Sequence, residues 1–365
     1  MTIGPTVHLI YPHGQRISCP DAIGSNLGQR LAEHYTVRYY DWDDPRAIHP
    51  APGDILLGHP HPNPWTIFRR SLALPGWQRI LAIGPFSHAD PRYCAFLDSF
   101  VARCHLYLAI TGRYWFETVS QSIFAHWYPK MVHLDLAVDR RDFPPIKIRF
   151  NPPGQRRFVY VGHSGWTKNT GYLSEIARLM PETQVNWVGG GGRRIAGVTA
   201  LGSQDFTTEQ SRQLLASHDF LIIVSKADAN PVTILEAMAC GLIPVCTPQC
   251  GYTGYPGIIN IPLGDAPKAV ETLRRLQAMP EAELQSLQAS NWQILDEYFT
   301  WDRFALQVKD AIESEEMPAL LPVSLHQRLR IVRAELVSPL FFLRPVNALR
   351  YVYRSAQTVI PDPKR

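Results

Sequence analysis

Short apolar runs alternate with amphipathic segments along the chain, and this alternation is the strongest structural signal in the sequence. Strands of four to eight residues are predicted at ten runs. They are "TVHLIYP", "YTVRYYD", "DILLGHP", "RILAIGP" and "LYLAITG", followed by "RFVYVG", "QVNWVGG", "DFLIIVS", "LIPVCT" and "GIINIP". The predicted helices between them cover residues 21–34, 92–103, 170–180, 207–217 and 234–240. Apolar strands that alternate with helices predict parallel sheets covered on both faces, an α/β fold.

A proline-rich segment, "FPPIKIRFNPPGQRR" at 143–157, separates the two sets of strands. Its Pro-Pro pairs cannot continue a helix or lie inside a central strand, so it is the best candidate for a linker. We therefore predict two Rossmann-like domains, residues 1–146 and 147–312, whose sheets face a cleft. Residues 313–365 are predicted to form a basic helical extension.

Composition and charge narrow the class of protein only slightly. The 365 residues are 45% hydrophobic and 19% charged, a balance that suits two globular cores. A net charge of +4 implies no broad nucleic-acid surface, although residues 317–365 carry +6 (8 − 2) and the remainder about −2 (4 − 6). Six cysteines without a C-x-x-C pair, no leader-like start and no long apolar stretch favour a cytoplasmic protein without a spanning helix.

The most informative segment is "DANPVTILEAMACG" at 228–241, where two carboxylates flank the start of a predicted helix. Pro231 suits the first helical turn, because its missing N–H would be unpaired there. The N–H groups of Val232 and Thr233 would then form a cradle for a diphosphate. Carboxylates such as Asp228 and Glu236 accept paired hydrogen bonds from sugar hydroxyls. The segment therefore predicts a nucleotide-sugar site.

This segment resembles the E-x7-E signature of retaining GT-B glycosyltransferases, especially family 4. It departs from that signature at Asp228, where Glu is usual, and at Ala229, where Gly is usual. The residues that match are Pro231, Leu235, Glu236, Ala237, Met238, Ala239 and Gly241.

Other segments resemble the same family in the same order, over roughly residues 130–312. "RFVYVGHSGWTKN" resembles the strand and loop with the family's phosphate-binding Arg and Lys; Lys168 takes the Lys place and His163 stands where Arg is common. "VTALGSQ" resembles the segment that meets the nucleotide base, and "HLDLAVDRRDFPP" and "NWQILDEYFTWDRFA" match further landmarks. The first 130 residues match only in pattern, with Gly14 as the donor-loop glycine.

The resemblance implies a hexosyltransferase-type enzyme (EC 2.4) of polysaccharide biosynthesis, with the acceptor on the first domain. Its acceptor is a glycan, a lipid-linked sugar or a small molecule. Glu236 would bind the donor ribose and Asp228 would face the sugar, while Lys168 and His163 neutralise the diphosphate. The implied catalytic residues are Asp228, Lys168, His163 and His88. The implied donor-binding residues are Glu236, Gly14, Gly162, Pro231, Val232, Thr233, Gly202 and Ser203. No cofactor or metal is expected.

Each of these residues also has a plainer interpretation. Glu236 could be a surface helix acid, and Asp228 an acid favoured by the helix dipole. Lys168 and His163 could be solvated loop residues. Two further functions stay open: a degenerate GT-B protein that binds a nucleotide-sugar or glycan without transfer, and a nucleotide-sugar epimerase.

Two clusters in the first half suggest metal sites, and neither has a second set of ligands in the sequence. "DWDD" contains Asp41-x-Asp43, a pair that GT-A enzymes use to hold a metal with a nucleotide diphosphate. His59 and His61 in "GHPHPNP" are spaced like zinc ligands on one strand face.

The basic extension holds apolar residues at helical spacing beside arginines. The apolar positions are Leu325, Leu329, Val332 and Leu336. One hypothesis is an interfacial helix that contacts the inner face of a membrane peripherally. The other is a helix that packs back onto the first domain, with its arginines solvated or facing substrate.

Overall fold

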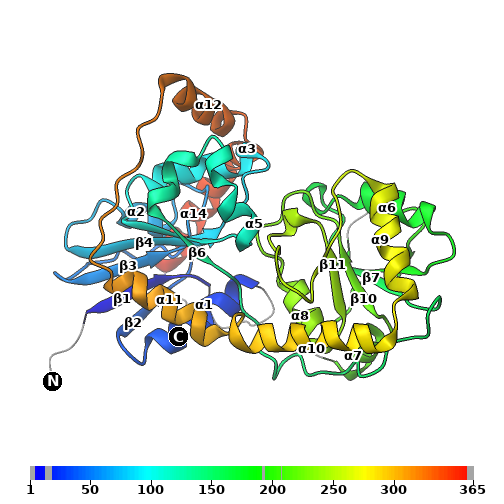
Figure 1. Ribbon diagram of the computed structural model, residues 1–365. Coiled ribbons are helices and arrows are strands. Elements are labelled where there is room, and N and C mark those ends of the chain that lie inside the picture. Colours follow the sequence, from blue (N-terminus) through cyan, green and yellow to red (C-terminus); the bar gives the residue numbers. More distant parts are fainter. Residues whose placement is uncertain (1–4, 13–18, 191–193, 207, 360–365) are drawn as a thin grey trace. The chain divides into compact units, whose positions relative to one another are not determined.

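The computed structural model describes residues 5–12, 19–190, 194–206 and 208–359, and the chain divides into two compact units (Figure 1). Unit 1 comprises Met1–Ile110, Glu117–Leu134 and Phe304–Arg365, and unit 2 comprises Thr111–Phe116 and Asp135–Arg303. Each unit holds one six-stranded parallel sheet with helices on both faces. The predicted α/β fold with two Rossmann-like domains is confirmed.

The sheet of unit 1 has the strand order β2-β1-β3-β4-β5-β6, and each neighbouring pair is parallel. Its strands are β1 (Thr6–Ile10), β2 (Thr36–Tyr40), β3 (Asp54–Gly58), β4 (Trp77–Pro85), β5 (Leu106–Ile110) and β6 (Met131–Leu134). Five of them are the strands predicted from the apolar runs. The sixth, β6, was not predicted, because it has only four residues and His133 interrupts its apolar run.

Helices cover both faces of the unit 1 sheet. Figure 1 shows α1 (Cys19–Leu31) and α11 (Trp301–Glu313) on one face and α2 (Ile67–Ser71) on the other. Helix α14 (Arg344–Val359) contacts the short helix α13 (Pro339–Phe342). The chain moves one way along the sheet through α1 and the other way through α2, so right-handed connections place these two helices on opposite faces. The remaining helical turns are α3 (Pro91–Cys94), η1 (Ala95–Leu97), α4 (Asp98–Val101), α5 (Gly112–Glu117), η2 (Val119–Gln121), η3 (Ala125–Lys130), α12 (Leu325–Leu336) and α13 (Pro339–Phe342). The single helix predicted over 92–103 is therefore three short turns.

The sheet of unit 2 has the order β12-β11-β10-β7-β8-β9. Its strands are β7 (Phe158–Val161), β8 (Val185–Val188), β9 (Thr199–Ala200), β10 (Phe220–Ile223), β11 (Ile243–Cys246) and β12 (Ile259–Asn260). Every residue of β8, β10 and β11 is buried, as expected for the centre of a doubly covered parallel sheet. All but the two-residue β9 were predicted.

The helices of unit 2 form two packed sets. α6 (Thr170–Leu179) packs against α9 (Ala266–Ala278), and α8 (Val232–Cys240) packs against α10 (Glu281–Glu297). Figure 1 shows these pairs on opposite sides of the sheet. The remaining long helix of unit 2 is α7 (Glu209–Ala216).

The chain of unit 2 reverses its direction across the sheet between β7 and β10. It leaves β7 toward β8 and β9, then returns so that β10 pairs with the other edge of β7. The loops that follow β7 and β10 therefore leave the sheet side by side, at its carboxyl end. Such a switch point is where open α/β sheets bind their ligands.

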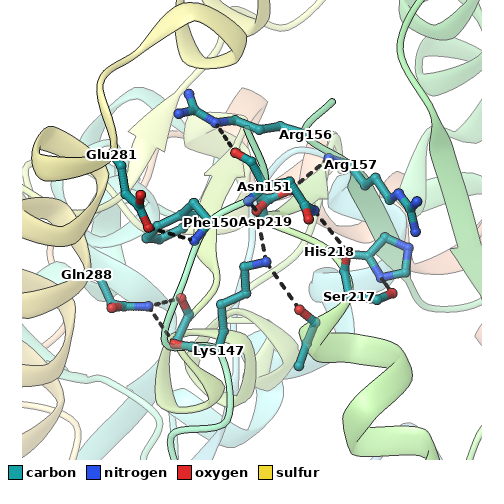
Figure 2. A network of polar contacts seen from close by, with 12 residues as sticks. Lys147, Phe150, Asn151, Arg156, Arg157, Ser217, His218, Asp219, Glu281 and Gln288 are labelled. Carbon is teal, nitrogen blue, oxygen red and sulfur yellow. Dashed lines mark hydrogen bonds and ion pairs between the residues drawn. The ribbon is translucent and has the colours of Figure 1, made fainter. Parts of the chain in front are cut away.

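The segment predicted to be a linker is anchored inside unit 2 by a buried carboxylate, Asp219 (Figure 2). Its oxygens accept hydrogen bonds from the backbone N and the side-chain amide of Asn151, at 2.8 and 2.7 Å, and from the backbone N of Arg157 at 2.9 Å. The Lys147 ammonium lies 2.9 Å from Asp219, and the two side chains are 4% and 0% exposed. This buried cluster attaches the proline-rich segment to Asp219, the residue that directly precedes β10.

The observed units differ from the predicted domains near their ends. Residues 304–312 were predicted to close the second domain, but they lie in unit 1 because α11 continues across the boundary. Glu313, at the end of that helix, accepts a 2.9 Å hydrogen bond from the Tyr35 hydroxyl of unit 1. Residues 111–116 belong to unit 2 although they follow β5.

We expect Asp219→Asn to lower the free energy of unfolding by about 3–5 kcal/mol, because it leaves the Lys147 ammonium buried without a counter-charge. Urea unfolding followed by circular dichroism measures the change. Glu182→Gln is the matched control: it breaks an ion pair with Arg274 whose side chains are 55% and 58% exposed, and should cost less than about 1 kcal/mol. Equal effects of the two substitutions would refute the assignment of Asp219 as the anchor.

Candidate functional site

Two charged side chains meet at the switch point of unit 2. Lys168 lies in the loop after β7 and Asp228 in the loop after β10, and the Lys168 ammonium forms an ion pair with Oδ2 of Asp228. The side chains are 19% and 16% exposed, so the pair is largely screened from water yet reachable. The Ser225 hydroxyl donates to the same carboxylate oxygen at 3.3 Å. Two oppositely charged groups are thus held at the position where an anionic ligand would enter.

The loop after β7 is shaped to present Lys168. A 3-10 turn, η4 (Trp166–Lys168), ends at Asn169, whose φ of 55° lies in the left-handed region that Asn tolerates better than most residues. A second contact joins the two loops, because the backbone N of Lys226 donates to the carbonyl of Thr167 at 2.9 Å. The Lys226 ammonium lies 3.8 Å from the centroid of the Trp166 ring, which is 53% exposed.

The backbone of Asp228 is fixed from two further segments. Its N–H donates to the Gln249 carbonyl at 3.1 Å, and its own carbonyl accepts from Nε1 of Trp115 at 2.7 Å. Gly251 approaches so closely that an added Cβ would lie 2.4 Å from the Ala229 carbonyl oxygen, at a φ of +91°. The loop conformation therefore depends on residues far from it in the sequence.

The amino-terminal end of α8 follows this loop. Pro231 precedes the helix with a φ of −65°, and no side chain of the described residues caps the helix start. Val232 and Thr233, the first two helical residues, are partly exposed. Unpaired N–H groups and the positive end of the helix dipole together favour an anion at this point. The start of α8, where the sequence predicts a diphosphate cradle, thus follows directly on the loop that carries Asp228.

Glu236 lies in the second turn of α8. Within the part of the chain that the structure describes, no residue forms a hydrogen bond or an ion pair with its carboxylate, although the side chain is mostly covered. Desolvation raises the pKa of Glu236 to about 7. A carboxylate without a protein partner can accept hydrogen bonds from ligand hydroxyls.

The predicted glycines gather at the carboxyl ends of β7 and β8. The backbone N of Gly189 donates to the carbonyl of Gly202 at 3.0 Å, and an added Cβ on Gly189 would lie 2.0 Å from the Gly162 carbonyl oxygen. An added Cβ on Gly190 would lie 3.3 Å from the Ser203 hydroxyl. Gly162, Gly202 and Ser203 therefore lie close together in space, around Gly189 and Gly190.

His163 is exposed at the edge of the same site. Its Nδ1 accepts from the backbone N of Gly165 at 2.9 Å, and its carbonyl accepts from the Tyr160 hydroxyl at 2.6 Å. The acceptor role of Nδ1 places the proton of the neutral ring on Nε2, which is the atom left to donate to a ligand.

The predicted residues of the first half lie in unit 1 or outside the described residues. His88 follows β4 and its Nε2 lies 2.8 Å from the Thr118 hydroxyl. His59 follows β3, and its Nδ1 lies 3.2 Å from the Tyr11 hydroxyl. Burial lowers the pKa of His59 to about 4, which keeps its ring neutral. Gly14 lies outside the described residues.

Neither suggested metal cluster gains further ligands. Among the described residues, no group of three or more His, Cys, Asp or Glu side chains is placed to hold a metal ion. Asp41 instead accepts a 2.8 Å hydrogen bond from the backbone N of Trp42. His61 accepts from the backbone N of Asn63 at 3.1 Å.

Four residues of the site were not predicted: Ser225, Trp115, Gln249 and Lys226. Ser225 closes the run "DFLIIVS" and could have been suspected from its position after a buried strand. Trp115 carried no signal, because it lies 113 residues before the Asp228 carbonyl that it contacts.

Part of the second unit is similar to a known family of proteins. Residues 155–278, which include Lys168, Asp228 and Glu236, match the family model described as "Glycosyl transferases group 1". Over 136 residues the chain is 26% identical to the sulfoquinovosyl transferase SQD2 of Arabidopsis thaliana. That match covers 33% of this chain and 26% of SQD2, so the chain spans about a quarter of the length of this curated relative.

Solved structures resemble the chain over most of its length. Sucrose-phosphate synthase from Thermosynechococcus elongatus has a TM-score of 0.61 at 13% identity, over 84% of this chain and 98% of that one. HepE of Anabaena, in complex with UDP and glucose, has a TM-score of 0.58 at 12% identity. The match covers 84% of this chain and 99% of HepE. At these identities the likeness establishes the fold. The chain thus has a GT-B fold, and its second unit carries a segment similar to group 1 glycosyl transferases.

We expect the stability of the wild-type protein to fall as pH rises from about 5 to 8, relative to that of Glu236→Gln. The pKa of Glu236 is raised in the folded state, so the folded protein retains a proton that the unfolded chain has lost, and stability declines until pH passes about 7. The expected difference is about 2 kcal/mol, less than the full shift implies because the carboxylate keeps some contact with water.

Urea midpoints at several pH values measure this difference. Glu175→Gln, at an exposed position on α6, is the control and should shift the profile by less than about 0.5 kcal/mol. Parallel pH profiles for wild type and Glu236→Gln would show that this carboxylate is ordinarily solvated.

Proposed function

We propose that the chain is a retaining glycosyltransferase that moves a sugar from a nucleotide-sugar donor to an acceptor. The observation that carries this proposal is the Lys168–Asp228 pair at the switch point, beside the uncapped start of α8. A cation and a helix amino terminus together suit a diphosphate, and an adjacent carboxylate suits sugar hydroxyls. Group 1 glycosyl transferases resemble this segment, and the complex of HepE contains UDP and glucose, which favours a nucleotide-activated hexose here.

In this proposal each side chain has a distinct role. Glu236 accepts hydrogen bonds from the donor ribose, and Val232 and Thr233 bind the diphosphate through their backbone N–H groups. The backbone groups of Gly162, Gly202 and Ser203 contact the nucleotide. His88 would act on the donor sugar, as the family resemblance implies.

The chemical step depends mainly on the leaving group. Breaking the bond between sugar and diphosphate builds positive charge on the sugar and negative charge on the departing phosphate. Lys168 would stabilise that phosphate, helped by Nε2 of His163, while Asp228 faces the sugar. In the free protein Lys168 is paired with Asp228, so donor binding would exchange that partner for phosphate. Because Lys168 and the helix supply the positive charge, no metal is required in this scheme.

The acceptor is open among a glycan, a lipid-linked sugar and a small molecule. A degenerate protein that binds without transfer is the second candidate, because Asp228 and His163 replace the Glu and Arg usual in the resembling family. Product analysis separates the candidates. If a nucleotide-sugar binds but no nucleoside diphosphate is released with any acceptor tested, the degenerate protein is supported. If the sugar of the nucleotide-sugar changes its stereochemistry without an acceptor, an epimerase is supported. Retention requires the product to keep the anomeric configuration of the donor.

We expect Lys168→Ala to lower kcat by about 100- to 1000-fold, because it removes one charge from the leaving phosphate. A thermal-shift screen of uridine, guanosine and adenosine diphosphates and their sugars first identifies the donor. Release of nucleoside diphosphate then measures turnover. Lys268→Ala, at an exposed position on α9, is the control and should leave both readouts unchanged. Full turnover by the Lys168→Ala enzyme would exclude the proposed role.

A further inference from the structure

Helix α12 presents its apolar side to solvent. The residues of this side recur at helical spacing and are 76%, 59%, 44% and 53% exposed: Leu325, Leu329, Val332 and Leu336. The opposite side, with Ile331 at 2% and Ala334 at 9%, packs on α3 and η1. An amphipathic helix normally turns its apolar stripe inward, so this orientation leaves apolar surface without a partner.

Helix α14 repeats this arrangement. Its exposed apolar residues are Val346, Leu349, Val352 and Tyr353, at 47%, 72%, 63% and 66%. The other side is attached to unit 1, because the Tyr351 ring stacks on Trp65 with centroids 5.6 Å apart and lies 5.3 Å from the Arg70 guanidinium. Helices α12 and α14 each contact unit 1 with one side and expose apolar residues on the other.

The short helix α13 and the residue after it, which lie between α12 and α14 in the sequence, also expose apolar side chains. Phe342 and Leu343 are 69% and 50% exposed. Beside them, Trp65 and residues of α13 and α14 line a hollow of about 330 Å³ that is almost wholly apolar. Among the described residues, eleven of the twenty-two exposed large hydrophobic side chains lie within residues 325–353. We call residues 325–353 the tail surface.

Positive charge accompanies the apolar residues of the tail surface. Arg328 pairs with Asp98 at 2.7 Å and Arg344 pairs with Glu335. Within the described chain, Arg330, Arg333 and Arg350 have no ion-pair partner. At helical spacing Arg333 flanks the apolar stripe of α12, and Arg350 follows Leu349 at the edge of the stripe of α14.

We propose that the tail surface binds the face of a bilayer that contains anionic lipid. Leucine, valine and aromatic side chains that project from docked helices can enter the boundary between headgroups and acyl chains. The three unpaired arginines then meet the anionic headgroups. A second copy of this chain is a poorer occupant, because the segment 317–365 carries +6 and like charges would repel. No described helix is long and apolar enough to cross a bilayer.

The test is flotation of the full-length protein with phosphatidylcholine vesicles and with vesicles that also contain phosphatidylglycerol. We expect the protein to float with the anionic vesicles, and the bound fraction to fall as salt rises. Arg330→Gln/Arg333→Gln/Arg350→Gln should weaken binding about 100-fold, at roughly five-fold for each arginine. Leu329→Ser/Leu349→Ser should also weaken it about 100-fold, at roughly ten-fold for each leucine.

Leu306→Ser on α11 is the matched control, because Leu306 is 55% exposed but lies outside the tail surface. It should bind like wild type, and all variants should keep the wild-type melting temperature because the replaced side chains are exposed. No flotation, equal binding to neutral vesicles, or loss of a dimer in the leucine variant without any flotation would overturn the proposal. Flotation requires no turnover, so its result is independent of the proposed glycosyl transfer.

Discussion

The return of the chain from β9 to β10 is the constraint on which the candidate site depends. β10 pairs with the edge of β7 that β8 leaves open, so the loops after β7 and β10 leave the sheet as neighbours. Lys168 and Asp228 are 60 residues apart in the sequence and form an ion pair for this reason. A sheet with its strands in sequential order would separate these loops by the width of two strands, and α8 would begin far from Lys168.

A strand as short as β10 needs support at both of its ends. Its four residues separate the buried Asp219 cluster at one end from Ser225 and Asp228 at the other. Buried ion pairs contribute little net stability, but they penalise any shift that would leave one charge unpaired. At the carboxyl end, Trp115 and Gln249 fix the backbone of Asp228. The position of that carboxylate therefore depends on contacts that lie outside the loop itself, as precise sites generally require.

Apolar periodicity was sufficient to predict ten of the twelve strands, and the resemblance directed attention to Lys168, Asp228 and Glu236. What could not be predicted depends on contacts distant in sequence. Trp115 belongs to unit 2 only because residues 111–116 pack there, and no local pattern signals that. The stripe from Leu325 to Leu336 predicted a helix correctly, but periodicity states which residues share a face and not which way the face points. Only Ile331 and Ala334 of α12 are buried, and they lie on the side opposite the leucines, so the stripe faces solvent.

The position of Glu236 lowers the stability of the folded protein at neutral pH, because its carboxylate is desolvated. The start of α8 favours negative charge, yet the dipole acts mainly within the first turn and Glu236 lies in the second. Desolvation therefore prevails and raises the pKa of Glu236 to about 7. Among the described residues none pairs with this carboxylate, and covering a polar group without a partner costs stability. A ligand with adjacent hydroxyls would supply the missing hydrogen bonds and favour the ionised form, so ligand binding would release a proton near neutral pH.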